Sequence, residues 1–512
     1  MYKQSTLLRH YIAWGAWGVL SFIISLVVFY PYLNTYFASD DWRTILRNMD
    51  ITILRNMDIN WLEIPTWFIQ LRVGWYRPMH DIFIAICWHF FGLKPLGYHI
   101  ISLIFYALIS ANVGLVASLL SNNKDIGLIS VVLFSVFATH AEPVLWLSGT
   151  NELIAGFFTL TSLIAFIYFK KNQHFMYFII TCVTLLLSFA SKETTLFLPA
   201  MLISYDVLTK VQKNEKWNIK NTLPLLIIIL LWIGFLLFRI PLGSAYDDIF
   251  VFSIPRFMLN IIFYILIGIF LLPKNYVFLE SIPTWHATPF LPLAALIGSS
   301  LIIIVLAWIW YKNDINFLKV QNNMLLFGII WGITAIIPVI FVVSERAFFI
   351  ASFGVIWIMA TMFVGAWQTV QAYSKLRQEG QSLLYQAIIL LFVGYVGLNV
   401  CILNYRSKWF YTSGVINQQV TTQLETHLQD VPDTTKVVLL NLPNHTQYTP
   451  TFRNAFPAIS HVLKYQHQFE LVLDTQWKQL LPQQQEHYLD AMQQTNMIIF
   501  LYHDGIIKVF SP

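Results

Sequence analysis

Long apolar segments separated by short polar ones dominate the chain. A helix needs about 20 mostly apolar residues to cross the hydrocarbon core of a bilayer, and the pattern predicts a series of such helices. They cover residues 11–32, 97–120, 126–139, 153–169, 175–190, 194–209, 222–240, 290–311, 324–343, 347–369 and 383–404. The first segment is too long for the apolar core of a signal peptide, and no small-residue cleavage site follows it. We therefore expect it to be retained as the first of about 11 transmembrane helices.

One further apolar segment, residues 257–272, does not fit this series. It has 16 residues and lies between Arg256 and Pro273, so it is short for a crossing. Counting it as a crossing would also place Lys312 and Lys375 on the outer side of the membrane. We expect a re-entrant or interfacial helix here.

Two polar regions interrupt or follow the apolar segments. The first is the loop 33–96, and the second is the tail 405–512, which is rich in Gln, Asn, Thr and His. In the tail, residues 437–442 predict a strand, 497–510 predict a hairpin that turns at 503–505, and 421–429 favour a helix. The predicted fold is mainly α: a polytopic membrane domain over 1–404 with a large first extracytoplasmic loop, and a small soluble α/β domain over 405–512.

Composition supports a protein that lives in lipid. Of the 512 residues, 57% are hydrophobic and 11% are charged, whereas about 25% are charged in a soluble domain. The three cysteines, Cys87, Cys182 and Cys401, stand singly in apolar segments, which argues against disulfides and thiolate metal sites. No glycine-rich phosphate loop or nucleotide fingerprint is present, so a nucleotide-sugar donor is unsupported, and nothing indicates nucleic acid as a partner.

The distribution of charge predicts the topology. With the N-terminus in the cytoplasm, the inner loops are strongly basic, while basic and acidic residues balance in the loop 33–96. This asymmetry follows the positive-inside rule. It places the loop 33–96 and the tail 405–512 together on the extracytoplasmic side.

Ionisable residues gather at the predicted outer ends of the helices. Such groups are costly near a bilayer and are functional candidates for that reason. They are Asp40 and Asp41 in SDDW, Arg77 and His80 in YRPMHD, His140, Glu142, Asn151 and Glu152 in HAEPVLWLSGTNE, Lys192 and Glu193 in SKETT, Arg239, and Glu345 and Arg346 in SERAFF. Two carboxylates ringed by cations suit a general base that acts on a hydroxyl while a phosphate departs.

Each cluster also has a purely structural interpretation, and the residues alone leave it open. Asp40 or Asp41 could cap the helix that follows. The pairs Lys192–Glu193 and Glu345–Arg346 could be interfacial anchors. His80 and His140 match no zinc motif and could be hydrogen-bonded structural residues. An eight-residue direct repeat, TILRNMDI at 44–51 and 52–59, is consistent with a tolerated duplication in a surface helix.

Five sequence pieces, taken in order over residues 35–370, resemble the C superfamily (GT-C) of membrane glycosyltransferases. They are SDDW, YRPMHDIFIAICWHFFGLKPLGYHIISLIFYAL, HAEPVLWLSGTNELIAGFF, SKETTLFLPAMLISYDVL and SERAFFIASFG. The similarity is to the branch of O-mannosyltransferases that carry membrane spans plus TPR repeats, and to their bacterial relatives. No 34-residue period follows the last span here, which favours a bacterial or archaeal enzyme of the inner (cytoplasmic) membrane.

This resemblance implies transfer of a sugar from a polyprenyl-phosphate donor to a protein, lipid or polysaccharide acceptor at the extracytoplasmic face. Asp40 would be the catalytic base and Asp41 would support it. Lys192 and Arg346 would bind the carrier phosphate. The remaining substrate-binding candidates are Arg239, Arg77, Glu142, Glu193, Glu345 and His140. The leaving group is a lipid monophosphate that these cations could stabilise, so no cofactor is required, and a divalent metal is conceivable but unsupported.

One departure and two alternatives accompany this interpretation. Family members commonly carry a basic residue where this chain has Thr150 and Asn151. A lipid-linked-oligosaccharide ligase or a polyprenyl-lipid flippase would also need many spans and phosphate-binding cations. A flippase, however, favours charges at the membrane midplane and internal repeats, and the predicted spans are nearly free of charge.

Overall fold

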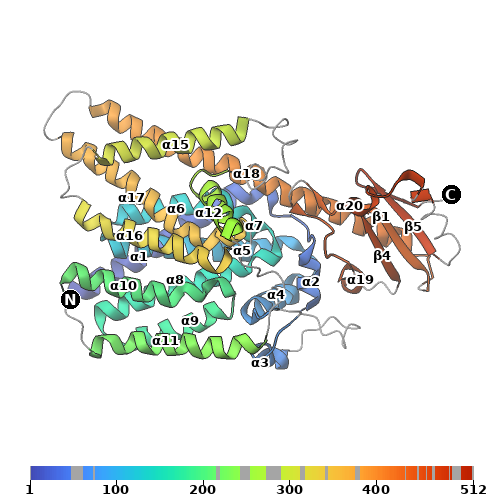
Figure 1. Cartoon of the computed structure of the whole chain (residues 1–512), viewed down its shortest axis with the longest axis horizontal. Coiled ribbons are helices and arrows are strands. Elements are labelled where there is room, and N and C mark those ends of the chain that lie inside the picture. The colour runs from blue at the N-terminus through green and yellow to red at the C-terminus, as the bar shows by residue number, and fades with distance from the viewer. Residues whose placement is uncertain are drawn as a thin grey trace.

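The computed structural model describes most of the chain: residues 2–47, 61–72, 75–214, 219–242, 254–272, 290–311, 318–340, 344–374, 381–432, 434–446, 449–456, 458–463, 467–483, 485–486 and 497–509. Most of the TILRNMDI repeat lies outside these residues. The described part forms a bundle of long helices with a small α/β domain at one end (Figure 1). The fold class predicted from the sequence is therefore confirmed.

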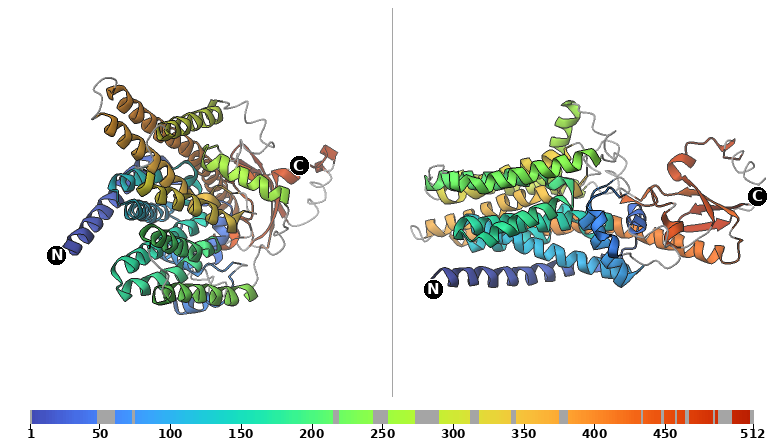
Figure 2. Two further views of the ribbon diagram at one scale, coloured as in Figure 1. Left: turned by 60° about the vertical axis from the view of Figure 1, so that its left-hand side comes forward. Right: turned by 90° about the horizontal axis from the view of Figure 1, so that it is seen from below.

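The long helices run roughly parallel to one another (Figures 1 and 2). Each predicted apolar segment coincides with one of them: α1 (Tyr2–Phe29), α5 (Pro95–Ser121), α6 (Lys124–Ser135), α8 (Asn151–Asn172), α9 (Phe175–Phe189), α10 (Leu198–Lys213), α11 (Ile219–Arg239), α15 (Phe290–Tyr311), α16 (Leu318–Ile336), α17 (Phe349–Ser374) and α18 (Gln381–Leu428). Among the described residues, six helices have the length and hydropathy of a membrane span, or seven if one bent pair counts as a span. The protein is thus a multi-pass membrane protein, and the number of crossings stays a prediction.

Helix α12 (Ile254–Gly268) lies across the bundle instead of along it. Figure 1 shows it nearly end-on, and the right view of Figure 2 shows it standing out from the bundle. Its inner face buries Phe263, Tyr264 and Ile267, and the Tyr264 hydroxyl donates to the Val339 carbonyl oxygen at 3.2 Å. Its outer face carries exposed apolar residues such as Ile262. The re-entrant or interfacial helix expected from the sequence stays a prediction, with which an orientation across the bundle is consistent.

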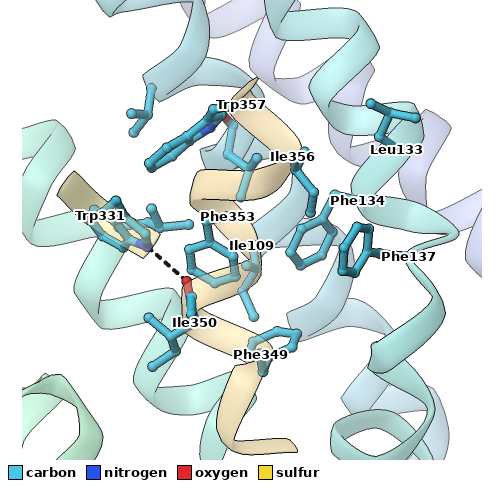
Figure 3. Packing of buried hydrophobic residues seen from close by; sticks show 14 of the residues in the cluster. Ile109, Leu133, Phe134, Phe137, Trp331, Phe349, Ile350, Phe353, Ile356 and Trp357 are labelled. Carbon is cyan, nitrogen blue, oxygen red and sulfur yellow. Dashed lines mark hydrogen bonds between the residues drawn. The ribbon is translucent and has the colours of Figure 1, made fainter. Parts of the chain in front are cut away.

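The core of the bundle is densely aromatic near the start of α17 (Figure 3). Trp331 and Trp357 are fully buried with their ring centroids 5.1 Å apart, and the Trp331 indole N–H donates to the Ile350 carbonyl at 2.8 Å. A buried indole needs such a partner to avoid an unsatisfied donor. This packing fixes α17 against α16 and so helps to position the SERAFF segment, whose last residue, Phe349, begins α17.

Short helices occupy the end of the bundle that faces the small domain. In the loop 33–96 these are α2 (Asp40–Arg47), α3 (Ile64–Trp67) and α4 (Pro78–Phe91). Further short elements follow the longer helices: η1 (Tyr30–Tyr32), η3 (Trp61–Glu63), η4 (Ala138–His140), α7 (Ala141–Leu145), η5 (Leu147–Gly149), η6 (Glu193–Phe197), η7 (Ile240–Leu242), η9 (Ile337–Val339) and η10 (Arg346–Phe348). Most of the ionisable residues of the sequence motifs described above lie on or beside these elements.

The small domain contains a four-stranded sheet in the order β4-β1-β5-β6. Strand β1 (Lys436–Leu442) pairs in parallel with β4 (Gln468–Leu473) and β5 (Met497–His503), and β5 turns back into β6 (Ile506–Val509). The other elements are β2 (His445–Thr446), β3 (Thr449–Pro450), α19 (Ala458–Val462) and α20 (Asp474–Trp477). The predicted strand at 437–442 and the predicted hairpin at 497–510 are both present.

The connection between the two parts differs from the prediction. Helix α18 has 48 residues and runs without a break past residue 404, so the helix predicted at 421–429 is its last part. Val420 and Leu424 of α18 join Phe37 and Trp42 of the first loop and Val437 of β1 in one hydrophobic cluster. The first loop, α18 and the small domain are therefore packed together and position one another.

Candidate active site

The SDDW turn positions two carboxylates differently. Ser39 adopts a left-handed backbone conformation with a φ of 52°, which is uncommon for a residue with a side chain. Its N–H donates to the Thr451 carbonyl at 2.8 Å, and its hydroxyl donates to the Arg453 carbonyl at 2.5 Å. The small domain thus holds the turn from which Asp40 and Asp41 start helix α2, where the helix dipole favours negative charge.

Asp41 points inward. It is only 3% exposed and accepts hydrogen bonds from the backbone N–H groups of Ala38 (3.1 Å) and Ser148 (2.8 Å). It ties the SDDW turn to the WLSG segment. Asp40, by contrast, is partly exposed and accepts a hydrogen bond from the Asn454 side-chain amide at 3.0 Å. The predicted pair therefore divides into an anchoring acid and an acid that faces open space.

The buried position of Asp41 predicts a pH-dependent stability. Burial raises the pKa of Asp41 to about 7, although the two backbone N–H groups act against this shift. The unfolded carboxyl has a pKa of about 4, so the native state holds the proton more tightly. The resulting stabilisation is complete below about pH 4 and is lost as the pH rises through about 7.

We expect the thermal midpoint of the purified protein to fall between about pH 5 and pH 8 as Asp41 ionises. In Asp41→Asn this part of the pH dependence should disappear. Below about pH 5 the variant should also be less stable than the wild type by about 1–3 kcal/mol, because an amide has one acceptor oxygen for two buried N–H donors, and this difference should shrink as the pH rises. Parallel pH profiles for the two proteins would contradict this account.

Asp40 lies between two cavities. The first, of about 180 Å³, is also lined by Arg43, Arg77, His80 and Arg346. Its remaining lining residues are Thr44, Trp75, Ser148, Asn151 and Asn454. Segments as distant in sequence as SDDW, YRPMHD and SERAFF therefore reach one cationic space, as expected of residues predicted to lie at the same ends of the helices.

The second cavity, of about 370 Å³, lies between the bundle and the small domain. It shares Asp40, Arg346 and Asn454 with the first cavity. Its other lining residues come from α7, the SERAFF segment, α18 and the small domain: Glu142, Trp146, Ser344, Glu345, Trp409, Phe410, His445, Thr449, Pro450 and Arg453. The small domain thus forms one wall of the space next to Asp40.

Ion pairs link the motif segments to one another. The pairs are Arg77–Glu193, Lys192–Glu152, Arg346–Glu142 and Arg406–Glu345. Each joins a cation of one segment to an acid of another, and most of these side chains are largely buried. These pairs favour a role for Lys192, Glu193, Glu345 and Arg346 in holding the motif segments together over the alternative role of interfacial anchors.

Arg77 is held from two sides. Its guanidinium makes a two-point contact with the Glu193 carboxylate, through Nε at 3.1 Å and a terminal nitrogen at 2.5 Å, and it lies 4.5 Å from the centre of the Trp75 ring. Burial alone would raise the pKa of Glu193, but Arg77 lowers it to about 2. Glu193 is thus a carboxylate at neutral pH and orients Arg77 along the first cavity.

Arg346 is positioned by Glu142. The Arg346 backbone N–H donates to the Glu142 carboxylate at 3.0 Å, and its guanidinium Nε lies 3.6 Å from the same group. The guanidinium also stacks 4.5 Å from the centre of the Trp146 ring. About a quarter of the Arg346 side chain (23%) stays exposed, so this cation can face a ligand in either cavity.

Other predicted site residues lie further back. Lys192 lines neither cavity in the described part of the chain and is buried against Glu152. The Arg239 guanidinium lies 5.8 Å from the centre of the ring of Tyr76, the residue that precedes Arg77 in the sequence. His140 is fully buried, with Nδ1 2.7 Å from the Tyr106 hydroxyl and Nε2 2.9 Å from that of Ser352. The structure thus gives His140 the hydrogen-bonded core environment that the sequence left open as its alternative.

Several site residues were missed by sequence reasoning. Arg406 is fully buried in α18, 3.1 Å from the Glu345 carboxylate, and donates to the Leu272 carbonyl at 3.1 Å. Its position as a lone arginine just after the apolar segment 383–404 could have identified Arg406 as a candidate from the sequence. Arg43, Arg453 and Asn454 line the cavities without any local pattern that would identify them. Among the described residues, no group of three or more His, Cys, Asp or Glu side chains is arranged to hold a metal ion.

The fold and the site define a class: multi-pass membrane proteins with a cationic cavity where the helical bundle meets a small α/β domain. No family model matches the chain. It is similar to Protein O-mannosyl-transferase Tmtc1 of Drosophila melanogaster, with 29% identity over 198 residues, 37% of this chain and 23% of that protein. It is also similar to human Protein O-mannosyl-transferase TMTC3, with 31% identity over 91 residues, 18% of this chain and 10% of that protein. These matches confirm the resemblance inferred from the motifs, and the chain spans less than a quarter of either relative's length.

Two solved structures are also similar. ArnT from Cupriavidus metallidurans in the apo state has a TM-score of 0.42 and 12% identity, with 95% of this chain and 93% of that chain covered. The archaeal oligosaccharyltransferase AglB from Archaeoglobus fulgidus, in complex with an inhibitory peptide and a dolichol-phosphate, has a TM-score of 0.47 and 11% identity. There the coverage is 95% of this chain and 69% of that chain.

Proposed function

We propose that this protein is a GT-C glycosyltransferase that moves a sugar from a polyprenyl-phosphate donor to an acceptor hydroxyl. The observation that carries this proposal is the place of Asp40, a partly exposed carboxylate between a cationic cavity and a second cavity under the small domain. Two reactants could approach Asp40 from two sides. The local similarity to O-mannosyltransferases supports the same activity.

In the proposed reaction the donor phosphate occupies the first cavity beside Arg346. Asp40 accepts the proton of the acceptor hydroxyl, whose oxygen attacks the anomeric carbon of the sugar. The bond from this carbon to the phosphate oxygen breaks, and its electron pair leaves with the lipid phosphate. Arg346 and Arg43 stabilise the charge that develops on this leaving group, with Arg77 and the more distant Lys192 adding to the positive field. These cations make a divalent metal unnecessary in the proposal.

The acceptor enters through the second cavity. Its hydroxyl would meet Asp40 where Asn454 holds the carboxylate, with Arg453, His445 and Trp409 around it. In the proposal this site faces the extracytoplasmic side of the inner membrane, which the positive-inside rule supports through the basic loops at the other end of the helices. In the proposal the acceptor hydroxyl belongs to a protein, a lipid or a polysaccharide, the three classes that the sequence left open.

The proposal is tested by incubating the purified protein with polyprenyl-phosphate sugars that carry a radiolabel in the sugar. We expect label to move to an acceptor and free polyprenyl phosphate to accumulate in equal amount. Movement of intact donor across a vesicle membrane, with no cleavage of the sugar–phosphate bond, would instead identify a flippase. Transfer of a whole oligosaccharide from a diphosphate carrier, with monophosphate donors inert, would identify a ligase.

Asn454 provides a test of the small domain's role. Replacing it with Ala removes the hydrogen bond that orients Asp40, and we expect transfer to slow about tenfold. The nearly isosteric Asn454→Asp places a second carboxylate beside Asp40 and should be slower still. Transfer rates and thermal midpoints of both variants check this. Equal rates for the two variants would mean that Asn454 only helps the small domain to fold.

A further inference from the structure

A third polar cavity lies at the opposite end of the bundle. It has a volume of about 460 Å³ and lies between the ends of α5, α8 and α10 and the beginning of α16. The first three helices each end here in a residue with left-handed backbone, Asn122, Gln173 and Asn214 respectively. The proposed transfer reaction uses none of the residues in this cavity.

The cavity is strongly basic and contains a built ion-pair network. Among the described lining residues, Lys170, Lys171, Lys210 and Lys213 stand against a single acid, Asp206. The Asp206 carboxylate is 1% exposed and lies 2.5 Å from the Lys170 ammonium and 2.7 Å from that of Lys210. Four positive charges against one negative charge leave a net charge of +3.

This arrangement goes beyond what membrane topology requires. Exposed lysines are sufficient for the positive-inside rule, whereas Lys210 is only 4% exposed and its partner is buried. Removing both charges from water is costly. Asp206 instead fixes two ammonium groups in the wall of a cavity, while Lys171 and Lys213 remain exposed at its rim.

The surroundings indicate the kind of anion that fits. Helices α5 and α8 have the length and hydropathy of membrane spans, and the cavity lies where they end, at the level expected for lipid headgroups. Leu119, Leu120, Leu208 and Phe327 form apolar parts of its lining next to the lysines. A small soluble anion has no apolar part to contact these residues. A phospholipid does, because its glycerol and acyl carbons lie directly beside its phosphate.

We propose that this cavity binds the headgroup of an anionic phospholipid from the leaflet opposite the small domain. Basic pockets between membrane helices on the cytoplasmic side are suited to phosphate headgroups. The lysine ammonium groups donate hydrogen bonds to the phosphodiester, and the neighbouring apolar residues contact the first carbons of the lipid. This lipid stabilises the ends of α5, α8 and α10 and takes no part in the transfer reaction.

Native mass spectrometry of the purified full chain with phosphatidylglycerol or phosphatidylcholine of identical acyl chains tests the proposal. We expect phosphatidylglycerol to be retained preferentially. Lys171→Gln and Lys213→Gln should each weaken this retention about fivefold. Lys124→Gln is the matched control, because Lys124 is exposed at the same end of the bundle but lies outside the described lining.

Equal retention of the two lipids, or equal weakening by all three substitutions, would overturn the proposal. Binding of inorganic phosphate at the lysines, at matched concentration and without binding of phosphatidylglycerol, would also overturn the proposal, because the site would then serve a soluble anion. Lys213 is exposed, and the exposed Lys171 donates one hydrogen bond, to the Leu119 carbonyl at 3.2 Å, which a glutamine amide can also make, so these variants should fold. Unchanged thermal midpoints in zwitterionic detergent verify this.

Discussion

Replacing Asp40 with Asn is expected to slow sugar transfer by about 100-fold or more while leaving the thermal midpoint unchanged. An amide has nearly the shape of the carboxylate but cannot accept the proton of the acceptor hydroxyl. Asp40 is partly exposed and accepts a hydrogen bond from the Asn454 amide, so loss of its charge at the start of α2 should cost little stability. The measurement is the initial rate of label transfer from a polyprenyl-phosphate sugar.

The neighbouring acid gives a matched control for this experiment. Asp41→Asn makes the same chemical change one residue away, but at a buried anchor between Ala38 and Ser148. It should mainly lower stability, whereas Asp40→Asn should mainly lower the rate. If both substitutions changed stability and rate alike, the division of roles within the SDDW turn would be wrong.

Replacing Arg346 with Met is expected to lower kcat/KM for the lipid-phosphate donor by about 100-fold to 1000-fold. The guanidinium lines both cavities and is a partly exposed cation placed to meet the leaving phosphate. Arg346→Lys keeps the charge but loses the planar fork and the stacking on Trp146. Its loss should therefore be intermediate.

A merely structural role for Arg346 would give a different pattern. In that case Arg346→Met would slow transfer because it leaves the Glu142 carboxylate without its cation, and adding Glu142→Gln would restore transfer. We expect no such rescue. Arg239→Met serves as a control, because Arg239 stacks on Tyr76 and lines neither cavity within the described residues. Its effect should be small.

Hydropathy predicted the helices well because each of them has a surface that must contact either lipid or other apolar helices. The same reasoning fails at α18, where the apolar residues end near 404 but the helix continues to Leu428. Its second part is stabilised by packing of Val420 and Leu424 into the small domain. That contact depends on strands formed later in the chain, and local periodicity does not contain it.

The candidate site was predictable where the charge was locally unusual. Acids and bases at helix ends identified Asp40, Arg77 and Arg346, and the structure brings all three to one cavity. The partners that position them were not predictable, since Arg77–Glu193 and Arg346–Glu142 join residues more than 100 positions apart. Asn454 was missed for the same reason, as it meets Asp40 across 414 positions.

The most direct test of the proposed site is a structure of the protein with a polyprenyl-phosphonate sugar, in which a carbon replaces the labile oxygen. The account predicts the phosphonate beside Arg346 in the smaller cavity and the sugar's anomeric carbon turned toward Asp40. An analogue bound with its phosphonate away from Arg346, or with its sugar out of reach of Asp40, would contradict it.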